Sequence, residues 1–588
     1  MKRIARLAII VIGLVALAAV AIANLVPDDL VKRRIADRVT AITGRTVTLD
    51  GDPMLSIYPH LAVSVGDLTI ADRGRIGDEP FVVAESLTAR LRVLPLFLGR
   101  VEVDAFELGR PRIRLTVDGD GRANWSDIVA GPAATAGPER LTITDGTIIY
   151  DELAGDRHEE LSAVALDVAW EDSSGQLGAT GTLRWRGETV EFSAMIAHPA
   201  TLATGEATPA RVAVGSTPLR ASFNGVLAIS DGFRFEGDGA VTTSSLRRVI
   251  EWLGRPMGTG SILGAAAIRG KVVWSDATVA FSEAEIELDG NAAEGTLTAR
   301  FADGRPRVEG RFDLARLDLS PYVEAVRASL IADGPWLIAP TNLPLVDGID
   351  ADLDITADEV LIGAVAIGPA TVTAASADGT AVVAIGDARF YGGRLEARAS
   401  ATMDEATLSV RASAEVADVP AGAALNDLAG ITVLDGTATA AVDLGGAGQN
   451  WGEFAQALSG TVTFALADGE LAGIGVDGLA ALAADPLADP VGPTTARTRF
   501  TTMAGTLAVG GGVLETVDLA AEGDDFRIVV SGWGSLLSGL VNGKAELATG
   551  ANNRPPIPLS IDGTWWEPVF ALDRDRLPLR SGDAAPRG

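Results

Sequence analysis

The chain has 588 residues, of which 47% are apolar and 5% aromatic, and its formal net charge is −30. A body this acidic is repelled by phosphate backbones, which excludes a nucleic-acid-binding protein as a function class. The chain has no cysteine, so disulfides, thiolate metal sites and cysteine nucleophiles are excluded as well.

The first element is an apolar run over residues 7–26, which has no charged residue and follows three basic residues. A helix needs about 20 apolar residues to cross a bilayer, so the run predicts an N-terminal transmembrane anchor. Two alternatives stay open. One is a cleaved signal peptide, with Ala21-Ile22-Ala23 as the cleavage site. The other is a buried core helix.

Basic residues lie on both sides of this run, so their number alone does not orient it. Long domains cross the membrane largely regardless of charge, and the short N-terminal end is therefore expected to stay in the cytoplasm. The sequence thus predicts a single-pass protein of the bacterial inner (plasma) membrane, with its bulk in the periplasm.

A short amphipathic helix is predicted next, because Val31, Ile35, Val39 and Ile42 fall on one helical face and Gly44 can end the helix. Its basic residues between positions 32 and 38 could touch lipid headgroups, and a solvated helix face is the alternative.

From residue 45 onward the hydrophobic period becomes two, which is typical of strands with one apolar and one wet face. The sequence predicts a long antiparallel meander with few helices. Asp-Gly pairs predict hairpin turns at 118–121, 145–146, 231–232, 303–304, 378–379, 435–436 and 468–469. Helices are expected near 245–253, 321–331, 451–458 and 476–484, and a linker at 129–138.

The chain is expected to divide into five parts. These are the anchor (1–26), a juxtamembrane helix with a first β region (27–244), a middle β region with helical insertions (245–430), a C-terminal β domain (431–580) and a polar tail (581–588). Many positions on the apolar face are Ala or Gly. Small residues there either leave room for a ligand or let the sheet curl tightly on itself.

Several segments resemble the AsmA family. Residues 43–72 begin with Thr-Gly-Arg and continue as strand, Pro-containing turn and strand, and residues 121–125 match its G-x-x-N-W element. Residues 458–479 and 558–568 look like its C-terminal domain. The segments occur in the expected order behind an apolar N-terminus, so the resemblance extends over essentially the whole chain, and the middle, roughly 180–443, matches only in style.

The resemblance implies an inner-membrane-anchored periplasmic protein that serves outer-membrane biogenesis. It also implies a mostly β fold in which an elongated, bent antiparallel sheet forms a groove, like the repeating β-groove lipid-transfer proteins. Phospholipid acyl chains would lie in the groove, and an outer-membrane or other envelope protein is a possible partner. The candidate groove-lining residues are Val279, Phe281, Ile286, Leu288, Phe312, Leu314, Val462, Phe464, Leu466 and Ile528.

No catalytic or metal-binding constellation is found in the sequence. The three histidines are far apart, and His158-Glu159 lacks the second histidine of a zinc protease helix. Neither Gly-Lys pair is followed by the Ser or Thr of a phosphate-binding loop. The sequence therefore predicts no enzyme, no cofactor and no metal.

Two functions of different classes remain. The first is a lipid conduit or carrier. The second is a non-transporting assembly factor or regulator that acts through protein contacts and has a packed interior. An outer-membrane barrel is disfavoured, because the low aromatic content leaves little for two aromatic girdles.

Overall fold

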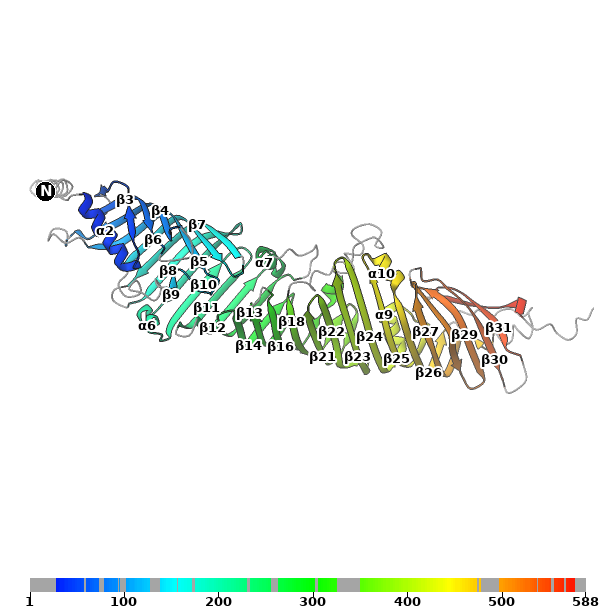
Figure 1. Cartoon of the computed structure of the whole chain (residues 1–588). Coiled ribbons are helices and arrows are strands. Elements are labelled where there is room, and N and C mark those ends of the chain that lie inside the picture. The colour runs from blue at the N-terminus through cyan, green and yellow to red at the C-terminus, as the bar shows by residue number, and fades with distance from the viewer. Residues whose placement is uncertain are drawn as a thin grey trace, which may run out of the picture. The chain divides into compact units, whose positions relative to one another are not determined.

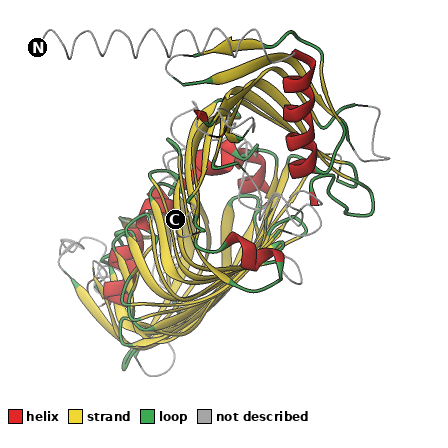
Figure 2. Ribbon diagram, turned by 90° about the vertical axis from the view of Figure 1, so that its left-hand side faces the viewer, coloured by secondary structure: helices red, strands yellow, loops and turns green. Residues whose placement is uncertain are grey.

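Long curved strands dominate the structure, a computed structural model, with a few short helices between them (Figures 1 and 2). It describes residues 28–576 apart from 58–59, 73–78, 94, 96–101, 127–137, 156, 172–174, 230–232, 255–262, 302–304, 325–348, 473–474, 477, 479–495, 537, 551–554 and 565–566. The fold is therefore mostly β, as predicted. The predicted membrane span at 7–26 lies outside the described residues. None of the helices that are described is both long and apolar enough to cross a bilayer.

The chain packs into two compact units, Met1–Arg255 with Ala265–Glu283 and Pro256–Gly264 with Ala284–Gly588. The boundary falls within strand β14 (Thr278–Leu288). The finer division into five parts stays a prediction.

The described residues of unit 1 form an open sheet with the helices α2, α6 and α7. Its elements are α2 (Asp28–Thr43), β1 (Val47–Leu49), β2 (Met54–Ser56), β3 (Ala62–Ile70), β4 (Val82–Leu91), β5 (Val103–Val117), β6 (Arg140–Glu152), β7 (Arg157–Trp170), β8 (Leu177–Trp185), β9 (Glu188–Ile196), α6 (Pro199–Ala203), β10 (Thr208–Gly215), β11 (Arg220–Ala228), β12 (Arg234–Thr243), α7 (Leu246–Trp252) and β13 (Ala266–Ser275).

The described residues of unit 2 are also mostly strands, with short helices between some of them. Its elements are β15 (Asn291–Arg300), β16 (Arg307–Leu314), β17 (Leu317–Asp318), β18 (Asp350–Ala357), β19 (Val360–Ile362), β20 (Val365–Ile367), β21 (Ala370–Ala377), β22 (Thr380–Phe390), β23 (Gly393–Asp404), β24 (Thr407–Pro420), α9 (Ala421–Ala429), β25 (Leu434–Gly448), α10 (Trp451–Ala457), β26 (Ser459–Ala472), β27 (Arg497–Gly510), β28 (Val513–Glu522), β29 (Phe526–Ser535), β30 (Val541–Thr549), β31 (Ile557–Gly563), β32 (Pro568–Leu572) and the 3₁₀ helix η2 (Arg574–Arg576).

Most neighbouring strands pair antiparallel, but the expectation of a purely antiparallel sheet is wrong at two places. In unit 1, β5 and β6 are parallel, and in unit 2 β18 is parallel to β16, with β19 parallel to β17. Parallel neighbours need a long crossover connection. The crossovers at 118–139 and 319–349 contain the predicted linker and the predicted helix at 321–331, which both lie largely outside the described residues.

Some predicted turns are turns and others are not. Asp378-Gly379 joins β21 to β22 with positive φ at both residues, as a tight hairpin needs, and the 118–121 segment also turns. The pairs at 145–146, 435–436 and 468–469 instead lie inside β6, β25 and β26, where the register shifts. These three predictions are wrong. The pairs at 231–232 and 303–304 lie outside the described residues.

The pair in β26 explains why an Asp-Gly sequence need not end a strand. Asp468 has a φ of +50°, and in the pairing with β25 Asp468 and Gly469 lie opposite Gly436 alone, which is a β-bulge. Leu466 before the bulge and Leu471 after it are both buried, although they are an odd number of residues apart. The bulge thus keeps both leucines on one face, which strict alternation would not allow.

We expect Gly469→Ala to lower the free energy of unfolding by about 1–3 kcal/mol, because a methyl group there has no space. It would lie 2.2 Å from the Asp435 carbonyl oxygen and 2.2 Å from the Phe500 ring. Gly510→Ala on β27 is the matched control, since nothing lies within 4 Å of its Cβ position. Urea unfolding of both variants measures the difference, and equal stabilities would contradict the prediction.

Two of the predicted helices are confirmed. Helix α7 is capped by the Ser245 hydroxyl, which accepts a hydrogen bond from the Arg248 N–H. Helix α10 is capped by Asn450. The helix predicted at 476–484 lies mostly outside the described residues. Helices α6 and α9 were not predicted, although α9 is longer than either confirmed helix.

Helix α2 matches the predicted juxtamembrane helix and ends at Gly44, which has a φ of +67°. Ile35 and Val39 are buried, and they pack with Val65, Leu68 and other side chains of β3 and β4 in one apolar cluster. Both units contain several separate apolar clusters of this kind.

A buried polar cluster holds the C-terminal end of α2. The Arg45 guanidinium donates from Nη1 to Asp72 Oδ1 at 3.1 Å, donates from Nη2 to the Asn124 carbonyl, and stacks over the Phe81 ring at 4.2 Å. Asn124 Nδ2 donates to Asp72 Oδ2 at 2.9 Å. Asn124 Oδ1 accepts from the Thr116 N–H at 3.0 Å. The Thr-Gly-Arg and Asn-Trp segments, far apart in sequence, therefore meet in one cluster.

Candidate functional site

The C-terminal strands of unit 2 present one apolar face. On β26, Val462, Phe464 and Leu466 are less exposed than the Thr and Ala residues between them. Strand β27 continues this face with Leu507, which pairs with Val462, and β29 continues it with Ile528 and Val530. Alternation therefore places a row of large apolar side chains on one side of neighbouring strands.

This face encloses an apolar cavity of about 390 Å³. Strands β26 to β31 form one wall, and α9 with the segment leading into β25 forms another. The lining side chains that carry the argument are Leu425, Phe464, Leu507, Leu519, Ile528 and Val530. The volume falls in the range of about 300–1,000 Å³ that is usual for small-ligand sites.

The chemistry of the cavity follows from its composition. Polar atoms occur only on the lining side chains of Thr516, Trp533 and Asn542, and no lining residue is charged. The Asn542 amide already donates to Asp562 at 2.8 Å. Burying a charged or strongly polar group without partners is costly, so the cavity suits hydrocarbon. Among the described residues no cluster of His, Asp or Glu could hold a metal ion.

Helix α9 covers the cavity and is held by one side-chain hydrogen bond. Leu425 of α9 lines the cavity, while Ala421 and Ala424 are buried against the sheet. The Tyr391 hydroxyl, at the end of β22, donates to Asp427 Oδ2 on α9 at 2.5 Å. Burial, and then this hydrogen bond, raise the pKa of Tyr391 to about 12.

We expect Tyr391→Phe to lower stability by about 1 kcal/mol at pH 8, the usual worth of one hydrogen bond. The raised pKa of Tyr391 means that its contribution is complete below pH 10, its ordinary value, and is lost as the pH rises to about 12. The difference in thermal unfolding midpoint between wild type and Tyr391→Phe should therefore shrink from pH 10 to pH 12. A difference that stays constant over this range would contradict the prediction.

The structure places the predicted lining residues in several locations. Phe464 and Ile528 line the cavity, and Val462 lies on the same face of β26. Leu466 is buried beside it with Leu471 and Phe500. Phe312 and Leu314 belong to a different apolar cluster of unit 2, around Val360 and Val372. Val279, Phe281, Ile286 and Leu288 lie on β14 and do not line the cavity.

Several lining residues were missed by the sequence analysis, among them Leu507, Leu514, Leu519 and Val530. Their strands do show alternation, but β28 shifts register between Thr516 and Leu519, which hides the shared face of Leu514 and Leu519. The alternation of β27 and β29 was a signal that could have found Leu507 and Val530.

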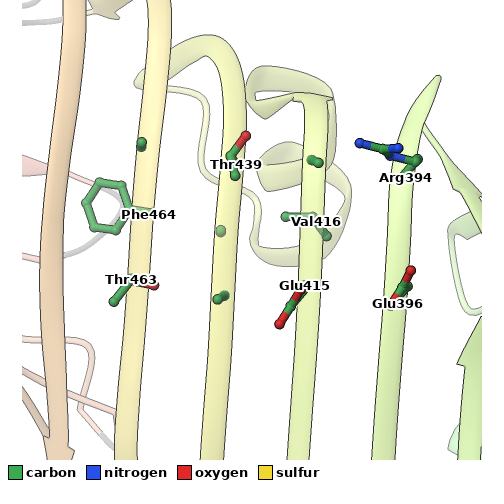
Figure 3. Close-up of a pocket in the computed structure, with 11 residues that line it drawn as sticks. Arg394, Glu396, Glu415, Val416, Thr439, Thr463 and Phe464 are labelled. Carbon is green, nitrogen blue, oxygen red and sulfur yellow. The ribbon is translucent and has the colours of Figure 1, made fainter.

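A second hollow, of about 560 Å³, lies over strands β23 to β26 of the same sheet, and Phe464 lines both this hollow and the apolar cavity (Figure 3). Arg394, Glu396, Glu415, Thr439 and Thr463 line it from β23 to β26. Glu396 and Glu415 are direct cross-strand partners, and both are exposed. Charged side chains line this hollow, so it does not suit hydrocarbon. The apolar cavity, which no charged residue lines, is the better candidate site for hydrocarbon.

The comparison with protein families decides the relationship of the chain. The model of the AsmA family matches residues 1–145 and 330–519, which is more than half of the chain. The chain belongs to the AsmA family. The first AsmA match contains α2 and the Arg45 cluster, and the second contains α9, β26 and β27 with part of the cavity wall. No curated protein matches the chain as a relative.

Proposed function

We propose that this AsmA-family protein is anchored in the bacterial inner membrane by residues 7–26 and serves outer-membrane biogenesis as a lipid carrier. Its bulk lies in the periplasm, and phospholipid acyl chains occupy the apolar face of its sheet. The observation that carries the proposal is the uncharged cavity lined by Phe464, Leu507 and Val530. Family membership and the open sheets of the two units are consistent with envelope biogenesis or lipid transport.

The energetics support an acyl chain as the occupant. Each buried CH₂ contributes about 0.8 kcal/mol, so even part of an acyl chain offsets much of the cost of leaving a bilayer. Several side chains on the apolar face, such as Val462 and Phe464, stay only partly buried. Guest hydrocarbon would cover this area.

Photo-crosslinking in cells tests the proposal. A benzophenone amino acid at position 507 faces the cavity, and the same amino acid at position 508 faces away from it, because Ala508 is exposed on the opposite face. We expect phospholipid crosslinks at 507 and not at 508. Crosslinks at neither position, in cells that make the full-length chain, would overturn the proposal.

A second candidate function is an envelope assembly factor or regulator that does not move lipid. The observation that favours it is the charged hollow of Figure 3, whose Arg394, Glu396 and Glu415 side chains could contact a protein. Charge reversal at Glu415 would then impair envelope assembly, while crosslinking of lipid at position 507 would not occur.

A further inference from the structure

In the described part of unit 1, exposed apolar side chains lie at the end of the sheet beside the start of α2. Strand β2 pairs only with β3 among the described strands, so it forms an edge of the sheet. Met54 is 68% exposed, Leu55 37% and Ile57 50%, and these residues lie on both faces of the strand. Exposed apolar side chains gathered in this way usually mark an interaction surface.

The register shows that β2 points toward the N-terminal end of α2. Strands β1 and β2 both run antiparallel to β3, so the chain leaves the C-terminal end of α2 and returns along it. Lys32, in the second turn of α2, lies 3.9 Å from Asp52, just before β2. Strand β2 continues past this contact in the same direction, away from the body of α2.

A second loop reaches the same end. The Leu91 N–H donates to the Leu61 carbonyl at 2.9 Å, which ties the end of β4 to the start of β3. Val93, two residues further, is 50% exposed. This end of the sheet therefore carries Met54, Leu55, Ile57 and Val93, and we name these four residues the apolar rim.

Exposed charges of both signs lie beside the apolar rim. Arg33 and Arg34 are exposed in the first turns of α2, next to Lys32, and Asp50 and Asp52 are exposed just before β2. Basic residues beside exposed apolar side chains are typical of surfaces that bind anionic bilayers. The apolar run at 7–26 ends two residues before α2 begins, so a bilayer that held this run would lie close in sequence to the N-terminal end of α2.

We propose that the apolar rim docks onto the surface of the anionic bilayer that holds residues 7–26, with lipid headgroups opposite Lys32, Arg33 and Arg34. The apolar rim would hold the edge strand β2 against the bilayer, and residues 7–26 would provide a second attachment. The inference rests on the membrane anchoring in the proposed function and is independent of lipid binding in the cavity.

The absence of cysteine makes a single-label experiment possible in the full-length chain. A bimane fluorophore is attached to Leu55→Cys, or to Leu153→Cys as the matched control. Leu153 is 59% exposed and lies at the opposite end of the same sheet, where its N–H donates to the Val117 carbonyl. Each protein is inserted into nanodiscs of phosphatidylethanolamine and phosphatidylglycerol, with or without a lipid that carries a doxyl quencher on its acyl chain.

We expect the quencher lipid to remove roughly half or more of the emission at position 55 and to leave position 153 unchanged. Nanodiscs of phosphatidylcholine alone should give weaker quenching at position 55.

Four other outcomes would contradict parts of the proposal. If the quencher lipid reduced the emission at position 55 no more than at position 153, the docking would be overturned. Blue-shifted emission at 55 without lipid quenching would overturn it too, because another part of the chain would then cover the rim. Equal quenching in both nanodiscs would overturn the role of the anionic headgroups. A chain that does not co-elute with nanodiscs would instead contradict the anchor.

Discussion

Leu507→Asp is expected to lower the phospholipid bound per chain at least about tenfold, because it places a carboxylate against hydrocarbon in the cavity. Leu507 lies opposite Val462 in the β26–β27 pair and is only partly buried, so the variant can fold with the carboxylate in the lining. The measurement is lipid extraction and native mass spectrometry of the purified full-length protein. Phospholipid held around the proposed anchor at 7–26 is common to all variants, so the expected loss refers to the phospholipid bound in excess of that amount.

Ala508→Asp is the matched control for this experiment. It adds the same charge one residue further along β27, but on the opposite, exposed face, where it pairs with Thr461. We expect its lipid content and its circular dichroism spectrum to equal those of wild type. Lipid content that stays at the wild-type level in Leu507→Asp would count against the cavity as a lipid site. Global unfolding of Leu507→Asp would instead favour a packed interior and the assembly-factor function.

A second pair of variants, on β29, distinguishes an effect on the cavity from a local effect on β27. Strand β28 lies between β27 and β29. Val530 lines the cavity from β29, and Ser531 points away from it and is exposed. Val530→Asp should therefore lose lipid and Ser531→Asp should keep it. Agreement between the two strands would assign the effect to the shared face and not to one residue.

The sequence predicts the β architecture well, because the period of two is a local signal that each strand carries by itself. It misreads Asp-Gly pairs such as 468–469, since an Asp with positive φ can start a hairpin or insert a bulge, and only the neighbouring strand decides which. The parallel pairing of β5 with β6 was also hidden. The pairing depends on which strand the long connection at 118–139 places β6 beside, and no local sequence pattern shows this.

The candidate site was predicted only in part for a similar reason. Alternation identifies which residues of a strand share a face, so Phe464 and Ile528 could be proposed. It does not say which strands lie beside each other or which helix covers them. Leu425 lines the cavity only because α9 packs over β24 and β25, and the spacing of Ala421, Leu425 and Leu428 on one helical face does not reveal that packing.

The Arg45 cluster shows what the family-like motifs do in this chain. Thr43 Oγ1 donates to the Val39 carbonyl and accepts from the Arg45 N–H, which helps to end α2 and directs Arg45 inward. Asp72 follows β3, Phe81 precedes β4, and Asn124 lies in the crossover between β5 and β6. One guanidinium thus joins four segments of the chain through its side-chain contacts.

Arg45→Met is expected to lower the free energy of local opening of α2 and β3 by about 3–5 kcal/mol, because it leaves the Asp72 carboxylate without its buried partner. The Arg45 side chain is 1% exposed and that of Asp72 13%, so water cannot replace the lost contact fully. Native-state hydrogen exchange of α2, β3 and β4 measures the effect locally.

The exposed ion pair between Arg122 and Asp120 is the control. Its side chains are 77% and 75% exposed and its atoms lie 3.2 Å apart, yet Arg122→Met should change local stability by less than about 1 kcal/mol.

Adding Asp72→Leu to Arg45→Met should recover part of the loss, since the double variant buries no unpaired charge. A double variant as unstable as the sum of the single variants would show that the ion pair itself contributes little. The stacking of Arg45 on Phe81 and its hydrogen bond to the Asn124 carbonyl would then account for the effect of Arg45.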